Sequence, residues 1–263
     1  MALPRSTFYY WDTARQAPDK YAQTKDRIDF IYTLHRGLYG YRRVASALQN
    51  EGVAVHENTV YRLMKKLGLQ SVQRPKKFKS HRGDVGEVAP NIIQRDFTAT
   101  GPNQKWTTDL SEFKVGSEKL YLAPIKDMFN GEIVAYTLGR RPTFELVTSL
   151  IKKSFRKLKP GDKPILHSDQ GWHYQMSRYC KMLRDKGVVQ SMSRKGNCLD
   201  NATMESFFGV LKSECFHLKK FTSIDELKTE LDAYIRYYNK VRIRTALGGL
   251  SPVQYRIQHA KAA

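Results

Sequence analysis

The stretch Asp200-Asn201-Ala202-Thr203-Met204-Glu205-Ser206-Phe207-Phe208-Gly209-Val210-Leu211-Lys212 carries the most informative pattern in this chain of 263 residues. Its large apolar residues recur three or four positions apart, at Met204, Phe207, Phe208 and Leu211. This spacing predicts a helix with one apolar stripe. Asn201, Glu205 and Lys212 then gather on an adjoining face, so the helix holds a carboxylate and an ammonium group beside a buried seam.

Two segments upstream each place an aspartate in or just after a strand-like run. Asp109 lies within residues 105–113, and Asp169 lies within residues 164–171. Sixty positions separate Asp109 from Asp169, and 35 residues lie between Asp169 and Glu205. A single aspartate at a strand end more often caps a turn. The joint spacing of three carboxylates indicates one shared site.

The spacing of Asp169 and Glu205 resembles that of the DDE transposases and retroviral integrases. Three motifs narrow the resemblance to the second-frame (OrfB-type) transposases of insertion sequences: His-Ser-Asp-Gln-Gly at 167–171, Asp-Asn-Ala at 200–202 and Glu-Ser-Phe-Phe at 205–208. The likeness runs over nearly the whole chain. It implies that Asp109, Asp169 and Glu205 are the catalytic carboxylates and that they bind metal.

The chemistry of phosphodiester cleavage and joining explains the need for three carboxylates. Two divalent cations about 3.5–4 Å apart activate the attacking oxygen, stabilise the leaving 3′ oxygen and neutralise charge on the phosphate. Mg²⁺ prefers hard oxygen ligands and takes only a few of them from protein. We therefore expect Mg²⁺, with Mn²⁺ as a substitute, and two ions per active site.

Two neighbours of Glu205 on the predicted helix have competing interpretations. Lys212, two helical turns beyond Glu205, is expected to point to the same edge and contact a DNA phosphate. An exposed helix lysine is the plainer alternative. Asn201 is expected to cap the helix rather than to orient DNA.

The charge of the chain favours a polyanionic partner. The chain holds 45 Lys and Arg against 25 Asp and Glu, a net charge of +20, and nucleic acid is the commonest partner for such a protein. A ribosome-like or merely basic protein is the alternative. No apolar run approaches the roughly 18 residues of a membrane span, and the start lacks the apolar core of a signal peptide. The sequence thus predicts a cytoplasmic protein, and the resemblance implies a bacterial, nucleoid-associated one.

Composition and pattern divide the chain into five segments. They are a remnant N-terminal helix (1–20), a helix-turn-helix DNA-binding domain (21–72), a basic linker (73–100), an RNase H-like catalytic core (101–220) and a C-terminal helical extension of that core (221–263). The first segment looks like the end of a helix whose earlier turns are missing, so one interpretation is that the chain is part of a longer fusion protein. The linker either follows a phosphate backbone or is simply solvated.

Three helical patterns in the second segment predict an all-α module. Their apolar positions are Ile28, Ile31 and Leu34, then Val44, Ala45 and Leu48, then Val60, Leu63, Met64 and Leu67. The third helix places Arg62, Lys65 and Lys66 opposite its apolar stripe, toward phosphates or base edges. Tyr-Gly-Tyr-Arg-Arg at 39–43 resembles the same family's helix-turn-helix segment and adds Arg42 and Arg43. A plain helical hairpin with a charged surface is the alternative.

The catalytic segment is predicted to be α/β. Its expected elements are strands at 105–113, 119–125 and 132–138, a helix at 143–158, a strand at 164–167, a helix at 174–186, a strand at 188–191 and the helix that carries Glu205. The order βββαβαβα is that of an RNase H-like mixed sheet flanked by helices. A final helix is expected at 223–239. Arg194 and Lys195, in a basic loop before Glu205, are expected to contact DNA strands.

The resemblance implies a DNA transposase of an insertion sequence, which cleaves 3′ ends at terminal inverted repeats and transfers the strands to a target. The expected partners are double-stranded DNA, further copies of the chain on that DNA and the upstream-frame product of the same element. Two alternatives stay open. One is a plain RNase H-like nuclease that cleaves and never joins. The other is a DNA-binding regulator, a shortened transposase product that occupies the element's ends.

Overall fold

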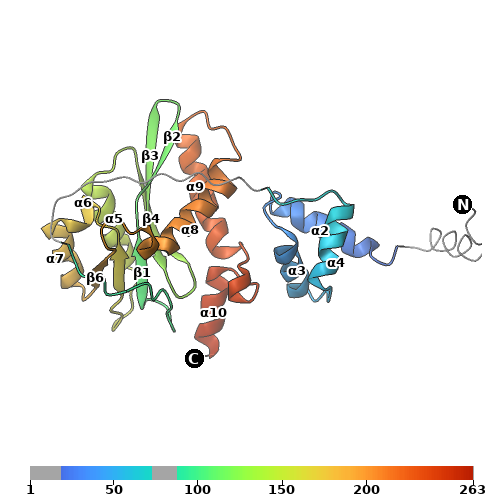
Figure 1. Cartoon of the computed structure of the whole chain (residues 1–263), viewed down its shortest axis with the longest axis horizontal. Helices are drawn as coiled ribbons and strands as arrows, with labels where there is room; N and C mark the ends of the chain where they lie inside the picture. Colours follow the sequence, from blue (N-terminus) through green and yellow to red (C-terminus); the bar gives the residue numbers. More distant parts are fainter. Residues whose placement is uncertain (1–18, 73–87, 263) are drawn as a thin grey trace, which may run out of the picture. The chain divides into compact units, whose positions relative to one another are not determined.

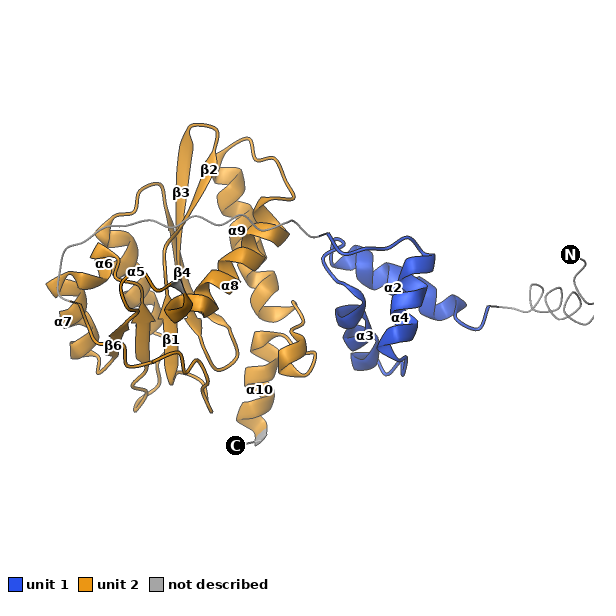
Figure 2. Cartoon of the chain, in the orientation of Figure 1, with its two compact units in different colours: residues 1–72 blue, residues 73–263 orange. Residues whose placement is uncertain are grey.

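A computed structural model of the chain describes residues 19–72 and 88–262, which belong to two compact units (Figures 1 and 2). The first unit ends at residue 72 and the second begins at residue 73. Residues 1–18, and with them most of the expected remnant helix, lie outside the described residues, as does the basic part of the expected linker at 73–87. Within the described ranges no helix is long and apolar enough to cross a membrane.

Residues 19–72 of the first unit form three helices, α2 (Ala22–Leu34), α3 (Tyr41–Asn50) and α4 (Glu57–Lys66). The apolar positions that pack its core are Ile28, Ile31, Val44, Leu48, Val60, Leu63 and Met64. His56 begins α4, because its ring Nδ1 accepts a hydrogen bond of 3.2 Å from the backbone N–H of Asn58. The expected three-helix module is therefore present.

Two expected core positions of this unit are wrong. Leu34 is 60% exposed and Leu67 is 38% exposed. A helix turns by about 100° per residue, so three steps leave each i+3 neighbour about 60° short of a full turn. Leu34 consequently lies about 120° away from Ile28 and has left the buried stripe. Leu67 follows the last residue of α4, where the chain turns away from the core.

The second unit is built on a six-stranded mixed sheet. Its strands are β1 (Lys105–Thr108), β2 (Ser111–Val115), β3 (Glu118–Asp127), β4 (Ile133–Gly139), β5 (Ile165–Ser168) and β6 (Val189–Met192). The order is β2-β3-β1-β5-β6, with β4 paired to β3. β5 runs parallel to both β1 and β6, whereas β3 is antiparallel to β1, β2 and β4. This is the predicted RNase H-like sheet.

The strand predicted at 105–113 is interrupted at Asp109. Thr108 pairs with Ile125 and Ser111 pairs with Leu122, so β1 and β2 keep one register against β3 and place Asp109 opposite Pro124. Proline has no N–H to donate. The Pro124 carbonyl accepts a 2.9 Å hydrogen bond from the Thr108 hydroxyl, so this side of Pro124 faces β1. Because Pro124 has no N–H to donate, the ladder of backbone hydrogen bonds with β3 is interrupted beside Asp109.

Helices cover both faces of this sheet (Figure 1). They are α5 (Phe144–Phe155), α6 (Trp172–Gln175), α7 (Ser177–Asp185), the 3₁₀ turn η1 (Cys198–Asn201), α8 (Ala202–Leu211), the π turn η2 (Lys212–Phe216), α9 (Ile224–Lys240), the 3₁₀ turn η3 (Thr245–Leu247) and α10 (Pro252–Ala262). The single helix expected at 174–186 is wrong, because Met176 is extended (φ −65°, ψ 131°) and separates α6 from α7. The expected final helix is α9, and the Ser223 hydroxyl caps it by accepting from the N–H of Glu226 at 3.1 Å.

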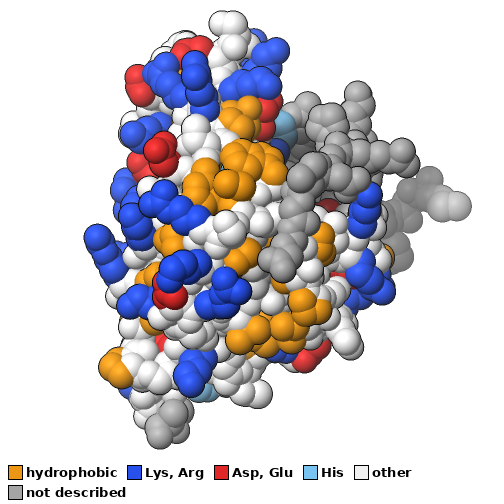
Figure 3. All heavy atoms as spheres, turned by 90° about the vertical axis from the view of Figure 1, so that its left-hand side faces the viewer, with side chains coloured by type: hydrophobic (Ala, Val, Ile, Leu, Met, Phe, Trp, Pro, Cys, Tyr) orange, Lys and Arg blue, Asp and Glu red, His pale blue; other side chains and the backbone are white. Residues whose placement is uncertain are grey.

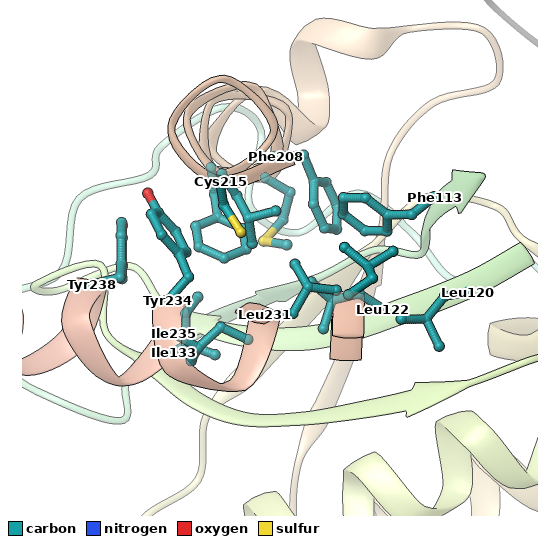
Figure 4. Packing of buried hydrophobic residues seen from close by; sticks show 14 of the residues in the cluster. Phe113, Leu120, Leu122, Ile133, Phe208, Cys215, Leu231, Tyr234, Ile235 and Tyr238 are labelled. Carbon is teal, nitrogen blue, oxygen red and sulfur yellow. The ribbon is translucent and has the colours of Figure 1, made fainter. Parts of the chain in front are cut away.

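Two apolar cores hold these layers together. On one face α8, η2 and α9 pack on β2, β3 and β4, and Figure 4 shows Phe208 beside Phe113, with Leu122 and Leu231 below them. On the other face α5 and α7 pack against Trp106, which is fully buried. Each fully buried side chain of this size contributes about 1.5–3 kcal/mol. The predicted stripe of α8, from Met204 to Leu211, lies in the first core.

A buried lysine connects the sheet to the start of α8. Lys126 of β3 is only 6% exposed, and its Nζ donates a 2.7 Å hydrogen bond to the backbone carbonyl of Thr203. Burial and, less strongly, the positive charge of Arg244 together lower the pKa of Lys126 to about 7. The unfolded chain keeps the usual lysine pKa of about 10.4.

We expect the unfolding free energy of the natural chain to rise with pH, and we expect the Lys126→Met variant to lack this rise. Between pH 7 and about 10.4 the unfolded chain binds a proton that folded Lys126 does not hold, so the unfolding free energy of the natural chain increases with pH across this window, by roughly 3–5 kcal/mol. Urea unfolding at several pH values measures the difference between the two chains. Lys153→Met is the matched control, because exposed Lys153 also donates to a backbone carbonyl, that of Tyr136 at 3.3 Å. Parallel pH profiles of natural chain and Lys126→Met would contradict the prediction.

Candidate active site

Asp109 lies at the break between β1 and β2, half-buried at the edge of the sheet. Its Oδ1 accepts a 2.7 Å hydrogen bond from the N–H of Leu110. Burial, then the charge of Asp169 and, less strongly, that of Glu205 together raise the pKa of Asp109 to about 7. Lys212 acts in the opposite direction. Asp109 therefore shares a corner with both other predicted carboxylates.

Asp169 follows β5 directly and meets Asp109 because β1 and β5 are parallel neighbours. Thr107 pairs with His167, so each aspartate stands two residues beyond the same rung of the ladder. Burial raises the pKa of Asp169, while a 3.0 Å hydrogen bond from the N–H of Gly171 to Oδ1 lowers it. The predicted convergence of these two side chains at one sheet edge follows from this register.

Gly171 fits this place because a side chain would not. A Cβ on Gly171 would lie 2.9 Å from Oδ1 of Asp169 and 3.3 Å from the ring of Tyr174. Its backbone angles (φ −58°, ψ 138°) suit any residue. The requirement for glycine is therefore one of space beside the carboxylate and not of backbone conformation.

Glu205 projects from the first turn of α8, where it is exposed. Partial burial raises its pKa. Two hydrogen bonds fix the start of this helix on the sheet beside β1: Lys126 donates to Thr203, and the Thr107 hydroxyl donates to Oδ1 of Asn201 at 2.8 Å. Asn201 is 5% exposed and makes no capping bond with α8. Its expected capping role is wrong, since Thr107 already uses its side-chain oxygen.

The three carboxylates offer the hard oxygen donors that Mg²⁺ and Mn²⁺ prefer. As placed, they approach one another without closing into a ligand set, since within residues 19–72 and 88–262 no three acidic, His or Cys side chains are close enough to hold a metal ion. A carboxyl whose pKa is about 7 beside a second carboxyl marks a deficit of positive charge. A divalent cation would offset that deficit, so the donor chemistry fits a metal.

Lys212 faces the same corner from the end of α8. It is half-buried, and its Nζ lies 5.3 Å from the ring centroid of Phe113. Burial lowers the pKa of Lys212, whereas the charges of Asp109 and Glu112 raise it. The Lys212 side chain thus lies near Asp109, at the sheet edge predicted from the sequence.

Arg194 and Lys195 occupy the loop before η1, and both are exposed. Arg194 is engaged within the chain, because its Nε and Nη2 donate to the two carboxylate oxygens of Asp200 at 2.9 Å each. Asp200 is 1% exposed and also accepts from Arg95 at 2.8 Å, and Arg194 holds the pKa of Asp200 well below its usual range. These contacts give Arg194 a structural role in shaping the loop that leads to α8.

The predicted DNA contacts of the first unit differ in their surroundings. Arg62, Lys65 and Lys66 are exposed on α4. Arg42 is exposed at the start of α3, whereas Arg43 is half-buried, lies 5.6 Å from the ring centroid of Tyr39 and donates to the Leu38 carbonyl at 3.5 Å. The structure therefore places Arg43 in the packing of its own unit.

A serine hydrolase arrangement is absent at Ser168. Buried His167 pairs through Nδ1 with Ser191 at 2.9 Å, and the Ser168 hydroxyl donates to the carbonyl of Asp169 at 2.9 Å. Neighbouring residues on a strand face opposite ways, so His167 and Ser168 do not meet.

A hollow in the surface of the second unit lies away from these carboxylates. It has a volume of about 640 Å³ and is lined by β4 together with residues of α5 and α9, among them Arg156 and Lys228. None of the three carboxylates lines it. Lys and Arg side chains are also spread over the face shown in Figure 3. A polynucleotide substrate lies along an open surface, so a deep pocket is not the feature that marks this site.

Two stretches of the second unit match the integrase core domain, residues 99–198 and 205–259, and residues 19–77 match an HTH-like domain. InsK of insertion sequence element IS150 from Escherichia coli (strain K12), named as a transposase, is 52% identical over 256 residues, which cover 97% of this chain and 90% of InsK. The chain belongs to the DDE transposases of insertion sequences. The transposase InsF for insertion sequence IS3A of the same organism is 30% identical to it over 262 residues, 97% of this transposase and 91% of InsF.

The fold of this transposase is also similar to that of a solved structure. A chain of the simian T-cell lymphotropic virus intasome, solved in complex with a PP2A regulatory subunit, matches with a TM-score of 0.52 and 14% identity, over 87% of this chain and 74% of that one. The transposase therefore combines an integrase-like core with an N-terminal helix-turn-helix module. Its core family is metal-dependent and acts on DNA.

Two side chains near this site, Lys126 and Tyr174, were not predicted from the sequence. Lys126 sits in a strand-like run where a buried amine is unexpected, and only the tertiary contact with Thr203 reveals its role. Tyr174 is 1% exposed, and the charges of both Asp169 and Asp109 act on its hydroxyl. Its place three residues after Gly171 was the only available signal in the sequence.

We expect Gly171→Ala to displace the Asp169 carboxylate and weaken metal binding at least tenfold, because the new methyl group would stand 2.9 Å from Oδ1. The loss of stability should stay near 1 kcal/mol, within the range for small overpacking. The rise of the melting temperature with added Mn²⁺ measures both effects. Gly209→Ala on α8 is the matched control, since a Cβ there meets nothing within 4 Å. An unchanged Mn²⁺ response in Gly171→Ala would contradict the prediction.

Proposed function

We propose that this transposase cleaves the 3′ ends of its element at terminal inverted repeats and joins them to target DNA, with Asp109, Asp169 and Glu205 holding Mg²⁺ or Mn²⁺. The observation that carries the proposal is the pairing of Asp109 and Asp169 at the ends of two parallel strands, where the pKa of Asp109 rises to about 7. Glu205 on α8 acts on the same carboxyl. Such a concentration of acid groups is unfavourable unless a cation shares the site.

The side chains of the site would divide the work. Asp109 and Asp169 hold the cations from the sheet, and exposed Glu205 completes the ligand set from the helix. Two bound ions would supply an activated attacking oxygen and stabilise the leaving 3′ oxygen. Lys212, half-buried behind them, would pair with a DNA phosphate. No side chain of the site is required to form a covalent bond with DNA.

The proposal extends to partners. The helix-turn-helix module would bind the element's ends through Arg62, Lys65 and Lys66, with Arg42 beside them. Two or more copies of the transposase would hold the two ends together, with the upstream-frame product of the element as a further partner. This chemistry would take place on chromosomal DNA in the bacterial cytoplasm.

We predict that Glu205→Gln abolishes cleavage and joining while DNA affinity stays within about twofold, because the carboxylate holds metal and not the duplex. The assay is Mn²⁺-dependent cleavage and joining of a labelled duplex that carries the element's own end. Glu145→Gln is the matched control, an exposed glutamate in the first turn of α5.

Cleavage without joining by the natural chain would favour the plain nuclease, and binding without either would favour the regulator. Full activity of Glu205→Gln would remove Glu205 from the site.

We predict that Arg62→Ala with Lys66→Ala weakens binding of the end duplex and lowers the salt slope of log K by about one per lost phosphate contact. Fluorescence anisotropy between 50 and 200 mM salt measures this. Arg27→Ala is the control within the same unit, because Arg27 is already neutralised by Glu51, its Nη2 donating at 2.6 Å. Equal salt slopes in the double variant and the natural chain would move DNA recognition away from α4.

A further inference from the structure

Tyr174 is a buried phenol at the floor of the proposed metal site. It belongs to α6, is 1% exposed and packs edge-on against Tyr179, with ring centroids 5.6 Å apart. Its carbonyl accepts a 2.7 Å hydrogen bond from the side chain of Gln190, which fixes the backbone. Gly171 borders one side of the ring, since a Cβ there would approach it to 3.3 Å. The ring is therefore held in one place by packing alone.

The hydroxyl of Tyr174 has no hydrogen-bond partner among the described residues. The nearby Thr108 hydroxyl, which donates to the Pro124 carbonyl, makes no hydrogen bond with it. A buried polar group without a partner is destabilising, and native structures rarely keep one without a reason. The acid groups of the proposed metal site supply the reason here.

Two carboxylates lie within electrostatic range of that hydroxyl. Burial raises the pKa of Tyr174 well above its usual value, and the charges of Asp169 and then Asp109 raise it further. The phenol thus keeps its proton and can donate a hydrogen bond to a nearby carboxylate. Asp169 acts on it more strongly than Asp109. The N–H of Gly171 occupies only one lone pair of the Asp169 carboxylate, at Oδ1, and others remain free to accept.

We propose that Tyr174 is a positioning residue of the metal site, whose O–H donates to the Asp169 carboxylate when that carboxylate holds metal. The inference rests on the proposed metal-binding role of Asp169. Gly171 N–H and Tyr174 O–H then fix the carboxylate from two directions, and its remaining lone pairs face the cation. Donors behind a ligand orient it and are generally worth 10- to 100-fold in metal affinity or activity. The arrangement also gives the orphaned hydroxyl its partner.

Tyr174→Phe tests this with the smallest change available, since it removes the hydroxyl and keeps the ring. We expect the Mn²⁺ concentration that gives half of the metal-induced rise in melting temperature to increase 10- to 100-fold. The Mn²⁺ concentration for half-maximal cleavage of the end duplex should increase by a similar factor. In EDTA the melting temperature should equal or exceed that of the natural chain, because no protein hydrogen bond is lost.

Tyr179→Phe is the matched control, because Tyr179 is an equally buried phenol in the same aromatic pair and the carboxylates do not act on it. Its Mn²⁺ dependence should match that of the natural chain. An unchanged Mn²⁺ dependence in Tyr174→Phe would overturn the inference. An equal loss in both variants, or a fall of melting temperature or loss of folding in EDTA, would show a purely structural hydroxyl and overturn it as well. If the natural chain itself showed no response to Mn²⁺, the proposed metal site would fail, which is a different result.

Discussion

The structure of the catalytic unit depends on one constraint, the repulsion between the carboxylates of Asp109 and Asp169. Two carboxylates in one half-buried corner raise each other's proton affinity, and the pKa of Asp109 reaches about 7. A protein retains such an arrangement at a cost in stability. The surrounding backbone limits that cost by turning one N–H toward each aspartate, from Leu110 and from Gly171. The remaining deficit of positive charge suits a divalent cation and the phosphates of DNA.

The sheet provides the rigidity that this corner needs. Asp109 and Asp169 stand at the same level because β1 and β5 are parallel and in register. Pro124 interrupts the ladder opposite Asp109, and the next backbone N–H, that of Leu110, donates to the Asp109 carboxylate. Glu205 is placed differently, by a helix whose first turn is tied to β1 and β3 through the Thr107–Asn201 and Lys126–Thr203 bonds. The third carboxylate is thus carried by a separate layer of the fold.

Positive charge serves two different purposes in this transposase. Arg194 and Arg95 neutralise buried Asp200 and shape the approach to α8, and Arg43 packs in the core of the first unit. Arg62, Lys65 and Lys66 remain exposed on α4. The net charge of +20 predicts a nucleic acid partner, but the charge total does not distinguish the basic residues that stabilise the fold from those available to DNA.

The sequence alone determined the family, the mixed sheet with helices on both faces, and the carboxylates to consider, because hydrophobic period and motif spacing are local properties of the chain. Tertiary structure decided the rest. The break at Asp109 depends on Pro124, which lies on another strand. Asn201 bonds to Thr107, 94 residues away, instead of capping its helix. The roles of Lys126 and Tyr174 depend on groups that folding brings close to them. The burial of a side chain and the electric field at it arise from neighbours that are distant in sequence.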